Sequence, residues 1–310
     1  MYEIRYEPGA GQIMRHEAWR IQQEHVERCR RVRGLLGFDP IFVLTTALGL
    51  MGIGPPDGCL LPAGLHHIGM FDRGKRRDFP PGVACHTWNQ LARRDVVVEV
   101  CGLRCTTPQA TFAHLLRWCG FEACIMLADR MACRDRLLRR GSVELLDDFI
   151  ATGRHVQGGR MGRRALSLAR AGTDSPAETR LRLRMLEGGL PEPEINHRVM
   201  VPGRGERFLD MAYPEPRIGI EFHGRHHLDQ RVRDAVRSNE LAAGRWTVFQ
   251  AWGTMLDDRD ALDGLLSSIR RALDDAGMGD QIRAPQSLWE LGDRRRSLQF
   301  IDRSTLTIGQ

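Results

Sequence analysis

The sequence predicts an α+β protein with two domains. Its 310 residues exceed the usual size of a single domain. Helical periodicity dominates the first half of the chain, whereas short runs of alternating apolar and polar residues follow residue 194. We therefore expect an N-terminal α+β domain with several helices over residues 1–172. We expect an α/β domain with a central mixed sheet flanked by helices over 175–275, and a C-terminal tail over 276–310.

The composition restricts the classes of function. Hydrophobic residues make up 42% of the chain, enough for packed cores. No run of about eighteen apolar residues is present, so we expect no membrane partner. The formal charge of +6 permits nucleic-acid binding without requiring it, and an arginine-rich proteome explains the many arginines equally well. Neither a GxxxxGK[ST] phosphate loop nor a signal-peptide pattern occurs, which predicts a cytoplasmic protein that uses no nucleoside triphosphate.

The cysteines and the adjacent histidines do not form a recognisable metal motif. All eight cysteines lie before Arg134, without the paired Cys-x-x-Cys spacing of most zinc sites. We expect reduced, mostly buried thiols. His66, His67 and His86 match no metal-ligand spacing, and we expect them in solvent-exposed loops.

The elements of the N-terminal half follow from periodicity and helix-start signals. Residues 12–36 predict a basic amphipathic helix, for which contact with DNA and a simply solvated face both stay open. A second helix is expected over 38–53, with Asp39 as its cap. A strand is expected over 95–100, followed by helices over 108–118, 121–133, 142–153 and 161–172.

The second domain begins with a helix that has clear start and stop signals. Ser175 suits the N-cap, Pro176 suits the first helical position, and Glu178 can complete a capping box. Gly188 and Gly189 end this helix. Strands are then expected over 194–201, 207–213, 218–223 and 245–252, with helices over 226–243 and 255–275.

The two strands RFLDMAY and IGIEFH are separated by a proline-containing turn. If the turn occupies residues 214–217, Tyr213 pairs with Ile218. Asp210 then lies directly opposite Glu221, with both side chains on one face. A register that is shifted by one residue would place the two carboxylates on opposite faces, and the pattern alone does not exclude it.

Asp210 and Glu221, placed in this way, predict a metal site. Two carboxylates this close stay ionised only if a positive charge lies between them. Mg²⁺ (or Mn²⁺) favours carboxylate ligands and can polarise a phosphodiester and activate a water. His223 lies two residues after Glu221 and shares its side of the strand, where an imidazole can accept a proton or bind a metal.

These residues resemble the PD-(D/E)XK nuclease superfamily, and more closely the small endonuclease-like domains related to very-short-patch-repair endonucleases. The similarity covers residues 175–252. It implies a restriction-endonuclease-like fold and metal-dependent cleavage of DNA, with Asp210 and Glu221 as metal ligands. The residues that match the family pattern in order are Asp210, Glu221, Gly224, His227, Asp234, Arg237, Gly244 and Trp246.

The resemblance also implies roles for residues around the metal. Glu178 would orient a water or a second metal, although a capping role explains this residue equally well. His223 or His227 would take a proton from the attacking water or give one to the leaving oxygen. Three arginines of the 226–243 helix would bind the flanking phosphates: Arg231, Arg233 and Arg237.

One residue departs from the family pattern, because relatives usually carry Asp or Lys where this chain has His223. The departure keeps open a catalytically inert protein that binds DNA or a partner. The N-terminal half more weakly resembles antitoxin-type winged-helix domains of abortive-infection systems, through its layout and the stretch GLRCTTPQATFAHLL. That resemblance implies a toxin–antitoxin or phage-defence role, which is compatible with either chemistry. The oligomeric state and the choice between DNA and RNA stay open.

Overall fold

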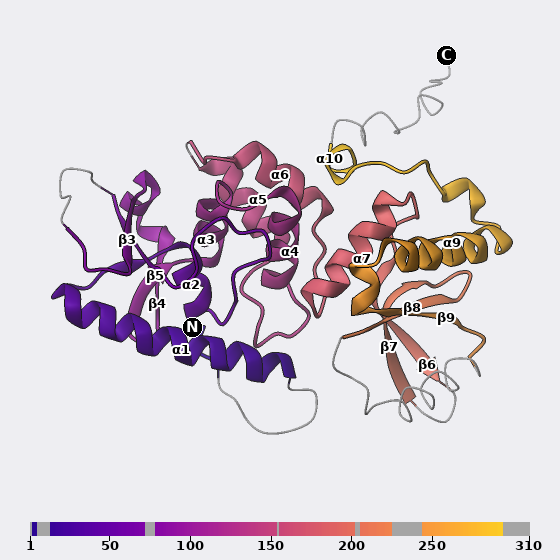
Figure 1. Cartoon of the computed structure of the whole chain (residues 1–310), viewed down its shortest axis with the longest axis horizontal. Helices are drawn as coiled ribbons and strands as arrows, with labels where there is room; N and C mark the ends of the chain where they lie inside the picture. The colour runs from indigo at the N-terminus through magenta and orange to yellow at the C-terminus, as the bar shows by residue number, and fades with distance from the viewer. Residues whose placement is uncertain are drawn as a thin grey trace, which may run out of the picture. The chain divides into compact units, whose positions relative to one another are not determined.

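The computed structural model describes residues 2–4, 13–71, 78–153, 155–201, 205–224 and 244–293 (Figure 1). The chain divides into two compact units, Met1–Ala171 and Gly172–Gln310. Each unit combines helices with a mixed sheet, so the predicted α+β class is confirmed. Within the described ranges, no helix has both the length and the hydrophobicity needed to cross a membrane.

The N-terminal unit is built on a sheet with the strand order β3-β2-β1-β5-β4. The first helix, α1 (Ile13–Leu36), packs its apolar side chains, such as Val26 and Val32, into the same core as Phe42 of the sheet. Its exposed face carries ion pairs one turn apart, for example Arg20 with Glu24. The other elements are β1 (Ile41–Phe42), α2 (Leu44–Leu50), β2 (His66–Met70), β3 (Val83–Thr87), β4 (Val97–Val100), β5 (Leu103–Thr106), α3 (Pro108–Leu115), α4 (Phe121–Met131), α5 (Val143–Thr152) and α6 (Gly159–Leu168).

The predicted helix over 38–53 is wrong in its first part. Residues 41–42 form strand β1, and the helix begins only at Leu44, after Val43 rather than Asp39 as its N-cap. Phe42 lies in the middle of the sheet, opposite Ile68 on one side and Cys105 on the other. These contacts are distant in sequence, and they override the local helix-start signal. The predicted strand over 95–100 is likewise shorter, since its first residues form a 3-10 turn.

The prediction that the histidines lie in exposed loops is also wrong. His66 and His67 belong to strand β2 and His86 to strand β3, and the two strands pair in parallel. His67 is 1% exposed, and its Nδ1 lies 2.9 Å from Nε2 of His86. Ile68, the next residue of β2, lies in the hydrophobic core, so the strand that it anchors carries the histidines into the sheet.

The Gly172–Gln310 unit contains a sheet with the strand order β6-β7-β8-β9. The β8 and β9 strands are parallel, whereas the other neighbouring pairs are antiparallel. The predicted helix over residues 226–243 lies outside the described residues. The elements are α7 (Pro176–Glu187), β6 (Glu194–Val201), β7 (Gly205–Tyr213), β8 (Ile218–His223), β9 (Thr247–Trp252), α9 (Arg259–Asp275) and α10 (Leu288–Leu291).

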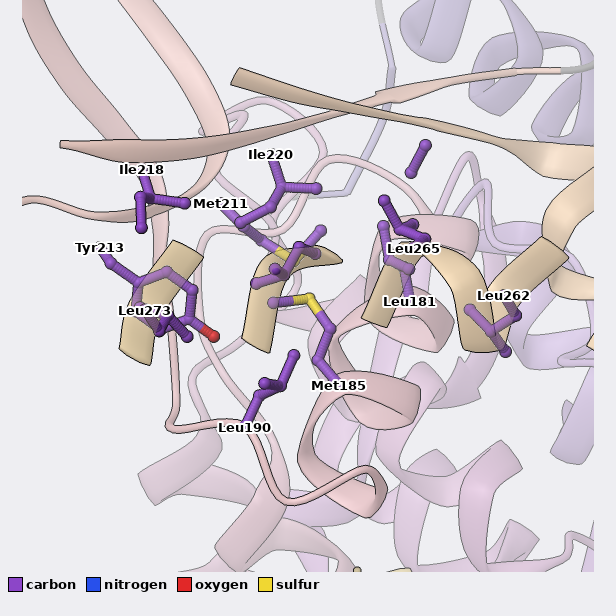
Figure 2. Packing of buried hydrophobic residues seen from close by; sticks show 12 residues of the cluster. Leu181, Met185, Leu190, Met211, Tyr213, Ile218, Ile220, Leu262, Leu265 and Leu273 are labelled. Atoms are coloured by element: carbon purple, nitrogen blue, oxygen red, sulfur yellow. The ribbon is translucent and has the colours of Figure 1, made fainter. Parts of the chain in front are cut away.

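The core of this unit lies between one face of the sheet and the helices α7 and α9 (Figure 2). Met211 and Ile220 from neighbouring strands pack against Met185 of α7 and Leu265 of α9. Part of the predicted tail also belongs to the unit, because the backbone N–H of Arg283 donates to the carbonyl oxygen of Gly189 at 2.8 Å. This packing holds α7 firmly beside the β7–β8 hairpin.

Candidate functional site

The β7–β8 hairpin has the predicted register. Tyr213 lies opposite Ile218, and the pairing ends at Met211 and Ile220. The predicted next pair, Asp210 and Glu221, continues this register but is not a bonded pair of the ladder, which ends one residue earlier. The two acidic residues instead lie where the strands separate.

The side chain of Asp210 occupies this opening. Its Oδ2 accepts a hydrogen bond from the backbone N–H of Phe222 at 2.7 Å. A side-chain oxygen therefore takes the N–H that a backbone carbonyl of β7 would accept in a continuing ladder. The result is a carboxylate held against the backbone of β8, next to Glu221.

The sheet is irregular on the other side of Asp210 as well. The pairing of β6 with β7 passes from Ile195–Met211 to His197–Leu209. Between them, Asn196 has a φ of 50°, in the left-handed region, and its side-chain amide donates to the carbonyl oxygen of Gly172. A left-handed backbone is uncommon for a residue other than glycine, and strained positions of this kind often occur near functional sites.

Ser175 is confirmed as the N-cap of α7, whereas the carboxylate of Glu178 bonds to residues 174 and 175 in a variant of the predicted capping box. The backbone N–H of Glu178 donates to Oγ of Ser175, and its Oε1 accepts from that hydroxyl at 2.8 Å. Its Oε2 accepts from the backbone N–H of Asp174 at 3.1 Å. Glu178 is 9% exposed, so this cap also buries a carboxylate.

The pKa of this carboxyl group depends on the charge of Asp210. Burial, and after it the negative charge of Asp210, raise the pKa of Glu178 to about 7, against the opposing hydrogen bonds from Asp174 and Ser175. Glu178 therefore takes part in the cap of α7 and also lies near Asp210. This arrangement concentrates negative charge in a poorly hydrated place.

Glu221 and His223 complete the described part of the site. Glu221 is 5% exposed and lies beside Gln250 of the parallel strand β9. His223, at the end of β8, stacks on Trp252, with ring centroids 4.5 Å apart. The sequence predicted the strand that contains Gln250 and Trp252 but not their place in the site. The local pattern does not determine which strand pairs with β8.

Four predicted site residues lie outside the described residues: His227, Arg231, Arg233 and Arg237. Within the described ranges, no group of three or more His, Cys, Asp or Glu side chains is arranged to hold a metal ion. The structure thus brings Asp210 near Glu178, and places it next to Glu221 along the strands. These described residues do not by themselves form a complete coordination shell.

Comparisons with protein-family models, with curated proteins and with solved structures give no match for this chain. The functional proposal therefore depends on the geometry and charge of the site.

The raised pKa of Glu178 predicts a pH-dependent stability. The folded pKa, about 7, exceeds the ordinary value of 4.5, so the contribution of this group is fully present below pH 4.5 and is lost as the pH rises through 7. Glu178→Gln removes this titration. The variant should therefore gain stability relative to the wild type as the pH rises between these values.

Hydrogen exchange of peptides from β7 and β8, measured across this pH range, checks the prediction. Glu206→Gln is the matched control, since Glu206 is exposed on β7. A stability difference that is the same at every pH would show that Glu178 titrates as an ordinary carboxyl group.

Proposed function

We propose that the Gly172–Gln310 unit is a metal-dependent nuclease with a restriction-endonuclease-like fold that hydrolyses phosphodiester bonds in DNA. The observation that supports this function is the opening of the sheet at Asp210, beside the buried carboxylates of Glu221 and Glu178. Buried carboxylates near one another are unfavourable unless a cation compensates their charge. Asp210 and Glu221 are the proposed ligands of Mg²⁺ or Mn²⁺.

The donor set suits such an ion. Mg²⁺ prefers carboxylate oxygens and usually binds through one or two carboxylates, with water and phosphate oxygens completing the shell. A carboxylate has about four lone-pair sites, so Asp210 can accept the N–H of Phe222 and still bind a cation. When bound, the ion would polarise the scissile phosphate and lower the pKa of a coordinated water.

The other residues then have distinct roles. His223, with its ring oriented by Trp252, would accept the proton of the attacking water. Glu178, once ionised, would orient that water through its carboxylate. His227 is a second candidate for proton transfer, and the three arginines that follow it are candidates for contacts with flanking phosphates.

A second candidate function is a catalytically inert protein that binds DNA or a partner, as a component of a toxin–antitoxin or phage-defence system. One observation favours it. The ring of His223 packs on Trp252, which is a structural role that needs no chemistry.

The proposal is tested by incubating the full-length protein with supercoiled plasmid, single-stranded DNA and RNA in the presence of Mg²⁺ or Mn²⁺. Wild type should cut at least one DNA substrate, and EDTA should stop the reaction. Glu221→Gln should reduce the rate by about 100-fold or more, the usual loss when a group that stabilises transition-state charge is removed. Glu206→Gln should cut normally.

If the wild type cuts no substrate and binds no Mn²⁺, the nuclease proposal is overturned in favour of the inert protein. If it cuts RNA alone, the chemistry stands and the assignment of DNA as substrate is wrong.

A further inference from the structure

The N-terminal unit contains a cleft of about 1020 Å³. Its walls come from the end of β3 and the following 3-10 turn η2 (Asn89–Ala92), from the C-terminal end of α3, and from the link between α5 and α6. Ligand sites of drug-sized molecules span a similar range of volumes, roughly 300–1,000 Å³. None of the residues that line the cleft belongs to the Gly172–Gln310 unit.

Aromatic side chains form one part of the lining. The ring of Trp88 stacks on the ring of His114, with centroids 4.3 Å apart and planes 9° from parallel. Phe71 also lines the cleft and is 60% exposed, so its ring is accessible to a ligand. Flat, partly exposed rings are the surfaces on which nucleobases stack.

Positive charge forms the other part. Arg117 is exposed at the cleft, and its guanidinium lies 4.7 Å from the ring centroid of Trp118. Arg93 lines the same cleft, where Asp95 pairs with it at 2.5 Å. Among the described residues that line the cleft, none is acidic. Because Asp95 offsets the charge of Arg93, the contact with an anion falls to Arg117, and arginine is well suited to phosphate.

A buried imidazole with an unsatisfied nitrogen lies in the same wall. His114 is 6% exposed, and its Nδ1 has no hydrogen-bond partner among the described residues. Burial lowers the pKa of His114 to about 3, so the ring is neutral. A neutral imidazole stacked on Trp88 extends the aromatic surface, and an unsatisfied buried polar atom in a native protein calls for an explanation.

We infer that this cleft binds a nucleoside monophosphate unit, with the base against the Trp88 and Phe71 rings and the phosphate on Arg117. The unit is either a free nucleotide or one nucleotide of a single strand of nucleic acid. A metal ion is a poorer fit, because arginine and exposed aromatic rings, rather than carboxylates, line the cleft. The inference is independent of the proposed nuclease activity, since the two sites share no residue.

The test is isothermal titration of the full-length protein in EDTA, which removes any contribution from the proposed metal site. The probes are deoxyadenosine monophosphate, deoxyadenosine, inorganic phosphate and a single-stranded oligodeoxyadenylate. The monophosphate should bind, and both deoxyadenosine and phosphate should bind at least about tenfold more weakly, because each retains only one of the two contacts.

Variants assign the binding to the cleft. Arg117→Gln should weaken binding of the monophosphate by about tenfold and leave binding of deoxyadenosine unchanged, since only the phosphate contact is lost. Trp88→Ala should weaken both, and Trp88→Phe should restore most of the affinity. Arg136→Gln is the matched control, because Arg136 is exposed and does not line the cleft. Circular dichroism verifies that each variant is folded.

The outcomes separate the two sources of the ligand. An oligonucleotide that binds much more tightly than the monophosphate identifies a single strand, and equal affinities identify a free nucleotide. The inference is overturned if neither the monophosphate nor the oligonucleotide binds, or if phosphate alone binds as tightly as the monophosphate. It is also overturned if Arg117→Gln and Trp88→Ala leave the affinity for the monophosphate unchanged. Asp210→Asn should bind as wild type, so a failure of the nuclease proposal does not affect this result.

Discussion

Replacing Asp210 with asparagine is expected to reduce metal-dependent cleavage by about 100-fold or more while leaving the fold at least as stable as that of wild type. Asparagine retains a side-chain oxygen that can accept the N–H of Phe222, so this contact between the two strands is preserved. It removes the negative charge that the proposed metal requires. The same change removes a charge that raises the pKa of Glu178, which relieves a repulsion in the folded state.

Plasmid cleavage with Mn²⁺ and hydrogen exchange of the β7 and β8 peptides measure the two effects separately. Asp210→Ala is the informative comparison, because it also removes the acceptor of the Phe222 N–H. An unsatisfied buried donor costs about 1–3 kcal/mol, so the alanine variant should lose stability as well as activity. Cleavage by Asp210→Asn at the wild-type rate would exclude this residue as a metal ligand.

Replacing Arg182 with alanine is expected to destabilise the Gly172–Gln310 unit by about 2–5 kcal/mol, the usual cost of truncating a large buried side chain. Arg182 lies on α7 and is 0% exposed, and its Nη1 donates to Oε1 of Glu192 at 2.8 Å. The truncation removes a long side chain from the interior and leaves Glu192 without the cation that it contacts there. The cost comes mainly from the lost packing of the Arg182 side chain, because the Glu192 side chain is 33% exposed and water can hydrate its carboxylate.

Hydrogen exchange of peptides from α7 and β7 reports the loss. Arg180→Ala is the matched control from the same helix, since Arg180 is partly exposed and a surface substitution usually changes stability by less than about 0.5 kcal/mol. Arg182→Met keeps most of the volume and should cost less than alanine. Equal effects of Arg182→Ala and Arg180→Ala would contradict the view that the buried Arg182 side chain stabilises this unit.

Interactions between residues that are close in sequence were predictable. The cap of α7 depends on Ser175 and Glu178, which are three residues apart, and both partners were identified. The register of the β7–β8 hairpin followed from the position of its proline-containing turn, and Tyr213 does lie opposite Ile218. In each case, backbone geometry over a few residues is sufficient to determine the contact.

Contacts between distant segments were not predictable in the same way. Residues 41–42 became a strand because two partner strands, far along the chain, lie on either side of Phe42. His67 became buried for a similar reason, once β2 and β3 paired. A local pattern cannot specify such partners, since several strands of similar composition are available.

The candidate site shows both kinds of determination. The sequence by itself determined the residue types and the register of the hairpin, because one turn sets the register of both strands. Only the tertiary structure decided that the ladder opens at Asp210, that Glu178 lies within reach of its charge, and that Trp252 supports His223. These features depend on the packing of α7 and β9 around the hairpin, and that packing is the sum of many contacts between segments that the sequence pattern treats separately.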